Sequence, residues 1–84
     1  MRFAVEFVYE RDAEAYVFVR RQERGDFTLS ESSRLGSAAI RPAVTQPRKI
    51  LADGTPDLDI FAFVLTDRRD AETFHVGQIV ELHP

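Results

Sequence analysis

Apolar side chains alternate with other residues along the opening segment 2–9. Phe3, Val5, Phe7 and Tyr9 fall at every second position, which is the period of a strand that buries one face. The sequence therefore predicts a first strand here, with these four side chains together on one face.

Two further segments carry apolar residues on both faces. Residues 15–21 form such a run up to the arginines at its end, and the polar connection 11–14 before it predicts a hairpin with the first strand. Residues 58–65 are apolar on both faces and only eight residues long, which favours a central strand over a helix. Residues 78–82 are the last expected strand.

The segment 22–44 mixes turn signals with weak strand signals. Gly25 can adopt a positive φ at little steric cost, so a turn at 22–26 is expected, with extended chain resuming at 27–29. The run 30–36 is either a one-turn helix capped by Ser30 and closed at Gly36 or an exposed loop.

Two prolines constrain the middle of the chain. Pro42 lies in the weakly strand-like segment 37–44 and cannot donate to a ladder, so we expect it at a sheet edge or a bulge. Pro47 lies in the longest stretch rich in turn formers, 45–55, which is the best candidate for a mobile loop. A charged turn is expected at 66–70.

Short strands with turns at near-regular spacing, and no long helix, are typical of a small all-β fold. We predict a single domain over residues 1–84, a closed or partly open antiparallel β-barrel of about five to seven strands with at most one short helical turn.

Four segments carry a resemblance to a known family. They are Glu6–Tyr9, Tyr16–Val19, the Gln22–Leu29 turn and strand around Gly25, and Val76–Val80 around Gly77. In this order and spacing the chain resembles the translation-protein β-barrel, the second domain of elongation factor Tu and its relatives. The resemblance spans nearly the whole chain and implies the same barrel.

The resemblance also implies a binding site, although this chain departs from the family pattern at several positions. The strand edge that helps to form the aminoacyl pocket in elongation factor Tu is matched here only by Glu6 and Tyr9, because Phe7 stands where the family has its second acid. The glycine-rich first turn is replaced by 12–15. No Gly-x-x-x-x-Gly-Lys-Ser/Thr loop occurs in the sequence, so GTP hydrolysis by this chain is excluded.

Charge and composition narrow the classes of function. The net charge of −3 gives no general attraction to a phosphate backbone, so RNA is a disfavoured partner and DNA is not expected. The sequence has no cysteine, no signal-peptide pattern and no long apolar run, so we expect a cytoplasmic protein without membrane contact.

Five cations are the candidate basic surface: Arg20, Arg21 and Arg24 at a strand end, and Arg48 and Lys49 in the long loop. If the barrel brings them together they would suit a phosphate or an acidic surface. The alternative is that they are solvated charges paired with Glu23 and Asp26, and the acidic balance favours it.

No residue set predicts catalysis, a cofactor or a metal. Asp53, Asp57 and Asp59 lie on or beside a turn, but their spacing does not fit a calcium loop and turn chemistry explains them better. His75 has no nucleophile or second histidine near it in the sequence, so it is expected to be an ordinary turn histidine.

The sequence therefore predicts a non-enzymatic, stand-alone binding module that works through protein–protein contacts, as a homo-oligomer or as an accessory subunit. The doubly apolar strands leave more hydrophobic surface than so small a barrel can hide, which indicates self-association or a protein partner. The alternative is an RNA- or ribosome-associated barrel that uses the five cations. Tyr9 and Tyr16 are expected to be core residues, although they would stack bases if exposed.

Overall fold

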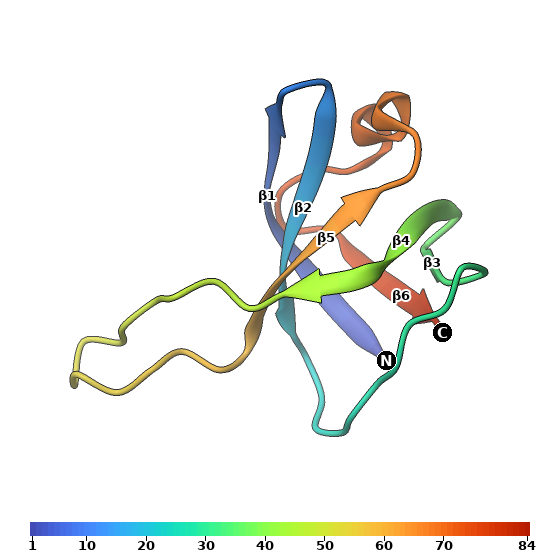
Figure 1. Ribbon diagram of the computed structural model, residues 1–84. Helices are drawn as coiled ribbons and strands as arrows, with labels where there is room; N and C mark the ends of the chain where they lie inside the picture. The colour runs from blue at the N-terminus through green and yellow to red at the C-terminus, as the bar shows by residue number, and fades with distance from the viewer.

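Six antiparallel strands close into a barrel in the computed structural model, which describes all 84 residues (Figure 1). Their bounds are β1 Arg2–Arg11, β2 Glu14–Arg21, β3 Arg34–Leu35, β4 Ala38–Thr45, β5 Ile60–Leu65 and β6 Ile79–His83, with one 3-10 helix, η1, at Arg68–Thr73. The order around the barrel is β1-β2-β5-β4-β3-β6, and β6 returns to β1. The predicted fold class is confirmed, and the barrel is closed.

A tight turn joins β1 to β2. Asp12 and Ala13 both have positive φ, 52° and 65°, as a two-residue type I′ turn requires. Arg11 pairs with Glu14 across it. The predicted first hairpin is therefore present.

A β-bulge at Glu6 changes which face of β1 points inward. Val5 pairs with Val19 but Phe7 pairs with Phe18, so one extra residue lies in β1. Phe3 and Val5 are buried, whereas Phe7 and Tyr9 are 45% and 46% exposed. The prediction that all four share one buried face is wrong, because the bulge shifts the alternation by one position.

The core fills the barrel around a cluster of aromatic rings. Phe3 lies edge-on to Phe27, Phe61 and Phe63, with ring centroids 5.6–6.0 Å apart, a favourable geometry for aromatic pairs. β5, between β2 and β4, supplies the fully buried Phe63 and is the central strand expected at 58–65.

The weaker predictions for the first half of the chain have mixed outcomes. Residues 27–29 form no strand, although Phe27 and Leu29 pack against the core. The run 30–36 is not helical: after a turn in which Ser33 Oγ accepts a hydrogen bond from Ser30 N, the short β3 buries Leu35. Pro42 lies where the β4–β5 register shifts, as expected for a bulge.

The one helical element lies where a charged turn was expected. η1 begins after Asp67, whose carboxylate accepts a hydrogen bond from Arg69 N, the usual cap of a helix start. It packs against β2 and β5 near the tip of the β1–β2 hairpin (Figure 1). The one-turn helix that was one of two alternatives for 30–36 is not formed.

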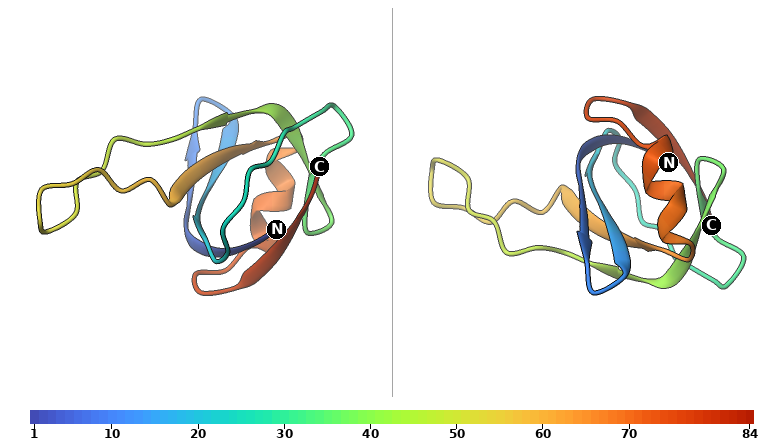
Figure 2. Two further views of the ribbon diagram at one scale, coloured as in Figure 1. Left: turned by 90° about the horizontal axis from the view of Figure 1, so that it is seen from below. Right: turned by 90° about the horizontal axis from the view of Figure 1, so that it is seen from above.

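The connection between β4 and β5 extends away from the barrel as an arm, defined here as residues 46–59 (Figures 1 and 2). Gln46 Nε2 donates to Leu58 O, Asp57 N to Lys49 O, and Leu51 N to Thr55 O, at 2.7–2.8 Å. Ile50 and Pro56 form an antiparallel bridge between these contacts. The segment expected to be a loop is thus an irregular, hydrogen-bonded extension of the β4–β5 hairpin.

We expect Phe63→Ala to lower the free energy of unfolding by about 3–5 kcal/mol, since it empties the centre of the core. Val76 is 75% exposed, and Val76→Ala is the control, with a change within about 0.5 kcal/mol. Urea unfolding followed by circular dichroism measures both. Equal effects would contradict a core centred on β5.

Candidate functional site

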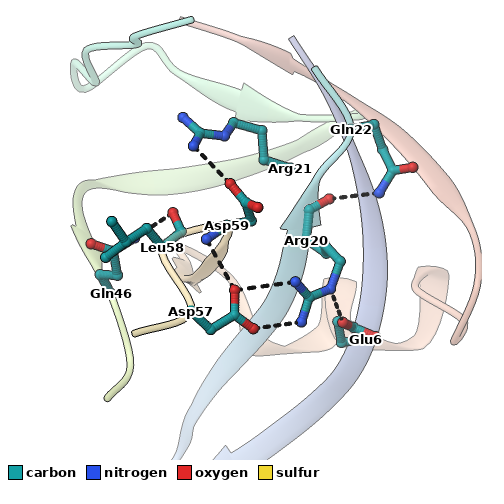
Figure 3. Close-up of polar contacts among 8 residues, drawn as sticks. All are labelled: Glu6, Arg20, Arg21, Gln22, Gln46, Asp57, Leu58 and Asp59. Atoms are coloured by element: carbon teal, nitrogen blue, oxygen red, sulfur yellow. Dashed lines mark hydrogen bonds and ion pairs between the residues drawn. The ribbon is translucent and has the colours of Figure 1, made fainter. Parts of the chain in front are cut away.

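The arm meets the barrel where β2 ends and β5 is about to begin. Arg20 pairs with Ile60 across these antiparallel strands. The two arginines that end β2 therefore face the acidic residues that precede β5, Asp57 and Asp59. Figure 3 shows these side chains converging at the base of the arm.

Asp57 is the centre of this arrangement, although it is only 3% exposed. Its Oδ1 and Oδ2 accept hydrogen bonds from Arg20 Nη1 and Nη2 at 3.2 and 2.8 Å. Oδ1 also accepts from Asp59 N at 3.2 Å. A two-pronged arginine contact of this kind is among the strongest hydrogen-bonded ion pairs in proteins.

Arg20 also bridges to the bulge of β1. Its Nε donates to Glu6 Oε1 at 2.7 Å, so one guanidinium joins two carboxylates from distant parts of the chain (Figure 3). Glu6 reaches this position because it is the extra residue of the β1 bulge. We name Glu6, Arg20 and Asp57 the anchor cluster.

The ion pair between Arg20 and Asp57 shifts the pKa values of both residues in the directions that its geometry requires. The hydrogen bonds from Arg20 lower the pKa of Asp57 and outweigh the opposing effect of burial. The bonds to Asp57, and then to Glu6, raise the pKa of Arg20 above its ordinary value. Both groups are therefore charged at neutral pH.

A second ion pair lies beside the cluster. Arg21 Nη2 donates to Asp59 Oδ1 at 2.7 Å, and Arg21 N donates to Asp59 O at 2.7 Å. The guanidinium carbon of Arg21 lies 5.8 Å from the centre of the Phe61 ring, within the range of a cation–π contact. The base of the arm is thus fixed to β2 twice.

Beyond its base the arm presents apolar side chains to solvent. Ile50, Leu51 and Leu58 are 67%, 45% and 59% exposed. A depression of about 310 Å³ lies between the two sides of the arm, with Arg48 and Lys49 among its lining residues. The arm therefore combines exposed apolar surface with two cations that have no ion-pair partner.

The predicted site residues divide into four places. Glu6 and Arg20 belong to the anchor cluster, with Arg21 beside it; Arg24 lines a separate depression with Arg21; Arg48 and Lys49 lie on the arm; Tyr9 lies near the hairpin tip. The expected arginine partners Glu23 and Asp26 are wrong for Arg20 and Arg21. Their acids are Glu6, Asp57 and Asp59.

Tyr9 belongs to an aromatic surface on the outside of the β1–β2 hairpin. Phe7 stacks on Phe18 with ring centroids 4.3 Å apart, and Tyr9 lies against Tyr16 at 6.3 Å. Tyr9 is therefore not the core residue that was expected. The bulge at Glu6 is what turns this half of β1 outward.

The remaining candidates form no convergent set. No group of three or more His, Asp or Glu side chains is arranged to hold a metal ion. Asp53 accepts hydrogen bonds from its neighbour Thr55, and Asp57 and Asp59 face arginines. His75 is exposed. No helix of this chain has the length and apolar character needed to span a membrane.

Comparison with known protein families, curated proteins and solved structures found no match for this chain.

Sequence reasoning missed Asp57 as a partner of Arg20. The signal was present as two arginines that end one strand and an Asp-x-Asp pattern that precedes another. It becomes informative only when β2 and β5 are known to be neighbours, and these strands are separated by 38 residues. No local pattern specifies that pairing.

The lowered pKa of Asp57 predicts acid sensitivity of the arm. The pKa of Asp57 in the folded protein lies below its unfolded value of about 3.9. The stabilisation from this carboxylate is therefore complete above about pH 3.9 and is lost as the pH falls through the folded pKa. Thermal unfolding between pH 7 and 2 should show a fall in Tm below about pH 4.

Asp57→Asn should lower the Tm at pH 7 and weaken its dependence on pH in the acid range. The control is Asp53→Asn, because the pKa of Asp53 is also lowered but only by Thr55 within the same turn. This control should change the Tm at pH 7 less. Identical Tm values for Asp57→Asn and the unchanged protein at pH 7 would refute the role given to this pair.

Proposed function

We propose that this barrel is a non-enzymatic binding module that acts through protein–protein contacts, with the arm as a contact element. One observation carries the proposal: exposed apolar side chains lie on a segment that is hydrogen-bonded along its length and anchored by an ion pair whose carboxylate, Asp57, is buried. A pre-ordered segment loses less conformational entropy on binding than a flexible loop does.

The character of the arm surface supports a protein partner. Ile50 and Leu51 are exposed at its outer end, whereas most large aliphatic residues of the barrel strands are buried. Exposed apolar groups that cluster on a projection are typical of contact sites. Arg48 and Lys49 lie beside them and favour a partner with an acidic rim around an apolar centre.

Binding to RNA is the second proposal and has less support. The charges of Arg20 and Arg21 are already paired with the carboxylates of Glu6, Asp57 and Asp59. Of the five candidate cations, Arg24, Arg48 and Lys49 have no acidic partner within ion-pair distance. Three cations on a protein of net charge −3 supply little sequence-independent affinity.

A relationship to the translation-protein β-barrel also belongs among the proposals. The barrel class and the positive φ at Gly25 and Gly77 agree with the turns on which the resemblance rests. Glu6, however, is held by Arg20, so it is not free to take part in an aminoacyl pocket.

Site-specific photo-crosslinking in the native cell tests the proposed function. A photoreactive residue replaces Ile50, and the matched control carries it at Val76, which is similarly exposed but lies away from the arm. We expect a defined protein adduct from position 50 and none from position 76. In the variant Leu51→Ser, the adduct from position 50 should decrease about tenfold, since an apolar anchor is lost.

Two results would overturn the proposal. An adduct that is destroyed by ribonuclease would favour the RNA alternative. Equal adducts from positions 50 and 76, or none at either, would remove the role of the arm.

A further inference from the structure

The outer half of β1 has a free edge although the barrel is closed. β6 pairs with β1 only from Arg2 to Ala4. Gly77 and Gln78, which precede β6, make the last hydrogen bonds to this edge, at Val5. Residues 7–11 pair with β2 alone. The β1–β2 hairpin thus extends past the closed part of the barrel with one edge unpaired (Figure 1).

The turn geometry identifies the backbone groups on this edge. In a two-residue type I′ hairpin, the residues that flank the turn exchange both hydrogen bonds, here Arg11 and Glu14. Pairs then alternate, so Tyr9 bonds to Tyr16 while Glu10 and Val8 direct their N–H and C=O groups away from β2. The free edge therefore offers two donors and two acceptors.

Open space lies beside these groups. Val8 and Glu10 line one side of a depression of about 440 Å³, and Arg68, Arg69, Ala71 and Glu72 of the η1 region line the other. η1 packs on β2 and β5, and it does not pair with the β1 edge. No other strand of the chain therefore occupies the β1 edge beside Val8 and Glu10.

We propose that a second copy of this chain adds to this edge, with the two β1 strands antiparallel and Tyr9 opposite Tyr9 of the second copy. This inference goes beyond the proposed function, because the β1 edge is a surface separate from the arm. In this register Val8 and Glu10 form hydrogen-bonded pairs with Glu10 and Val8 of the second copy, so all four outward groups of each strand are used.

Hydrogen bonding selects this register among the symmetric ones, because only an axis at Tyr9 pairs Val8 and Glu10, the two residues with outward backbone groups, with each other. A two-fold axis through Glu10 would oppose Glu10 to itself, and an axis through Val8 would oppose Glu6 to Glu10. Like charges directly opposite one another are destabilising. The axis at Tyr9 opposes Phe7 to Arg11 of the second copy, a pair suited to a cation–π contact. It also opposes Glu6 to Asp12, but Asp12 lies in the turn beyond the paired segment and Glu6 is paired with Arg20 of its own chain.

The same register extends the exposed aromatic surface across both copies. Phe7 and Tyr9 are 45% and 46% exposed in the single chain. In the pair, Tyr9 of each copy lies between Tyr16 of its own hairpin and Tyr9 of the other. The aromatic surface thus becomes continuous across the two hairpins, and an exposed apolar strand edge, a hazard for aggregation, is closed.

A single cysteine tests the register directly, because the sequence has none of its own. Non-hydrogen-bonded partners in antiparallel strands have Cα atoms about 4.5 Å apart, within reach of a disulfide. Copper-phenanthroline oxidation should convert most of the Tyr9→Cys protein into a covalent dimer.

Arg11→Cys is the matched control on the same strand. In the proposed register, position 11 of one copy lies opposite position 7 of the other. The two positions 11 are therefore separated by four residues along the strand, about 13 Å, and a disulfide cannot join them. Equal cross-linking of the two variants would mean random collision and would overturn the register.

Sedimentation velocity tests the pairing itself. We expect a concentration-dependent dimer of the unchanged protein. Glu10→Pro removes the outward N–H but no β1–β2 bond, and should weaken dimerisation about tenfold or more because two hydrogen bonds are lost in the symmetric pair. Glu10→Ala keeps the N–H and should retain the dimer.

Circular dichroism of Glu10→Pro must match the unchanged protein, so that misfolding is separated from lost pairing. If that variant misfolds, Tyr9→Lys, which opposes like charges at the axis, replaces it. A monomer at all concentrations would overturn this inference. It would leave the proposed function standing if the arm still captured a protein through position 50.

Discussion

The carboxylate of Asp57 is almost completely removed from water, and an ion so placed persists only when it is paired and hydrogen-bonded. Arg20 of β2 donates hydrogen bonds to this carboxylate, and it also donates one to Glu6 of β1. The backbone of Asp57 bonds to Lys49 on the other side of the arm. The direction in which the arm leaves the barrel therefore depends on a pair of charges rather than on apolar packing.

The bulge at Glu6 links this anchor to the outer surface of the molecule. A regular β1 would carry Phe7 and Tyr9 inward, and would leave Glu6 in the ordinary alternation. The extra residue moves Glu6 toward Arg20 and turns both aromatic side chains to solvent. One local irregularity thus contributes to both surfaces that we propose for binding, the arm and the hairpin edge.

The sequence predicted the elements whose signals are local. Strands at 15–21, 58–65 and 78–82, the hairpin turn, and a sheet edge or bulge at Pro42 follow from short patterns of apolar residues, glycine and proline. The bulge in β1 could not be predicted, because Phe3, Val5, Phe7 and Tyr9 alternate without interruption and only pairing with β2 shows the extra residue. The role of Asp57 was equally hidden, since it depends on β2 and β5 being neighbours.

The most direct test of this account is the rigidity of the arm, measured by nitrogen-15 relaxation of the backbone amides of residues 46–59. If the anchor cluster fixes the arm, the amides of Leu51 and Asp57 should have order parameters close to those of the barrel strands, about 0.85. Values below about 0.6 in the unchanged protein would mean that the arm moves freely. They would contradict the claim that the anchor cluster holds the arm in place.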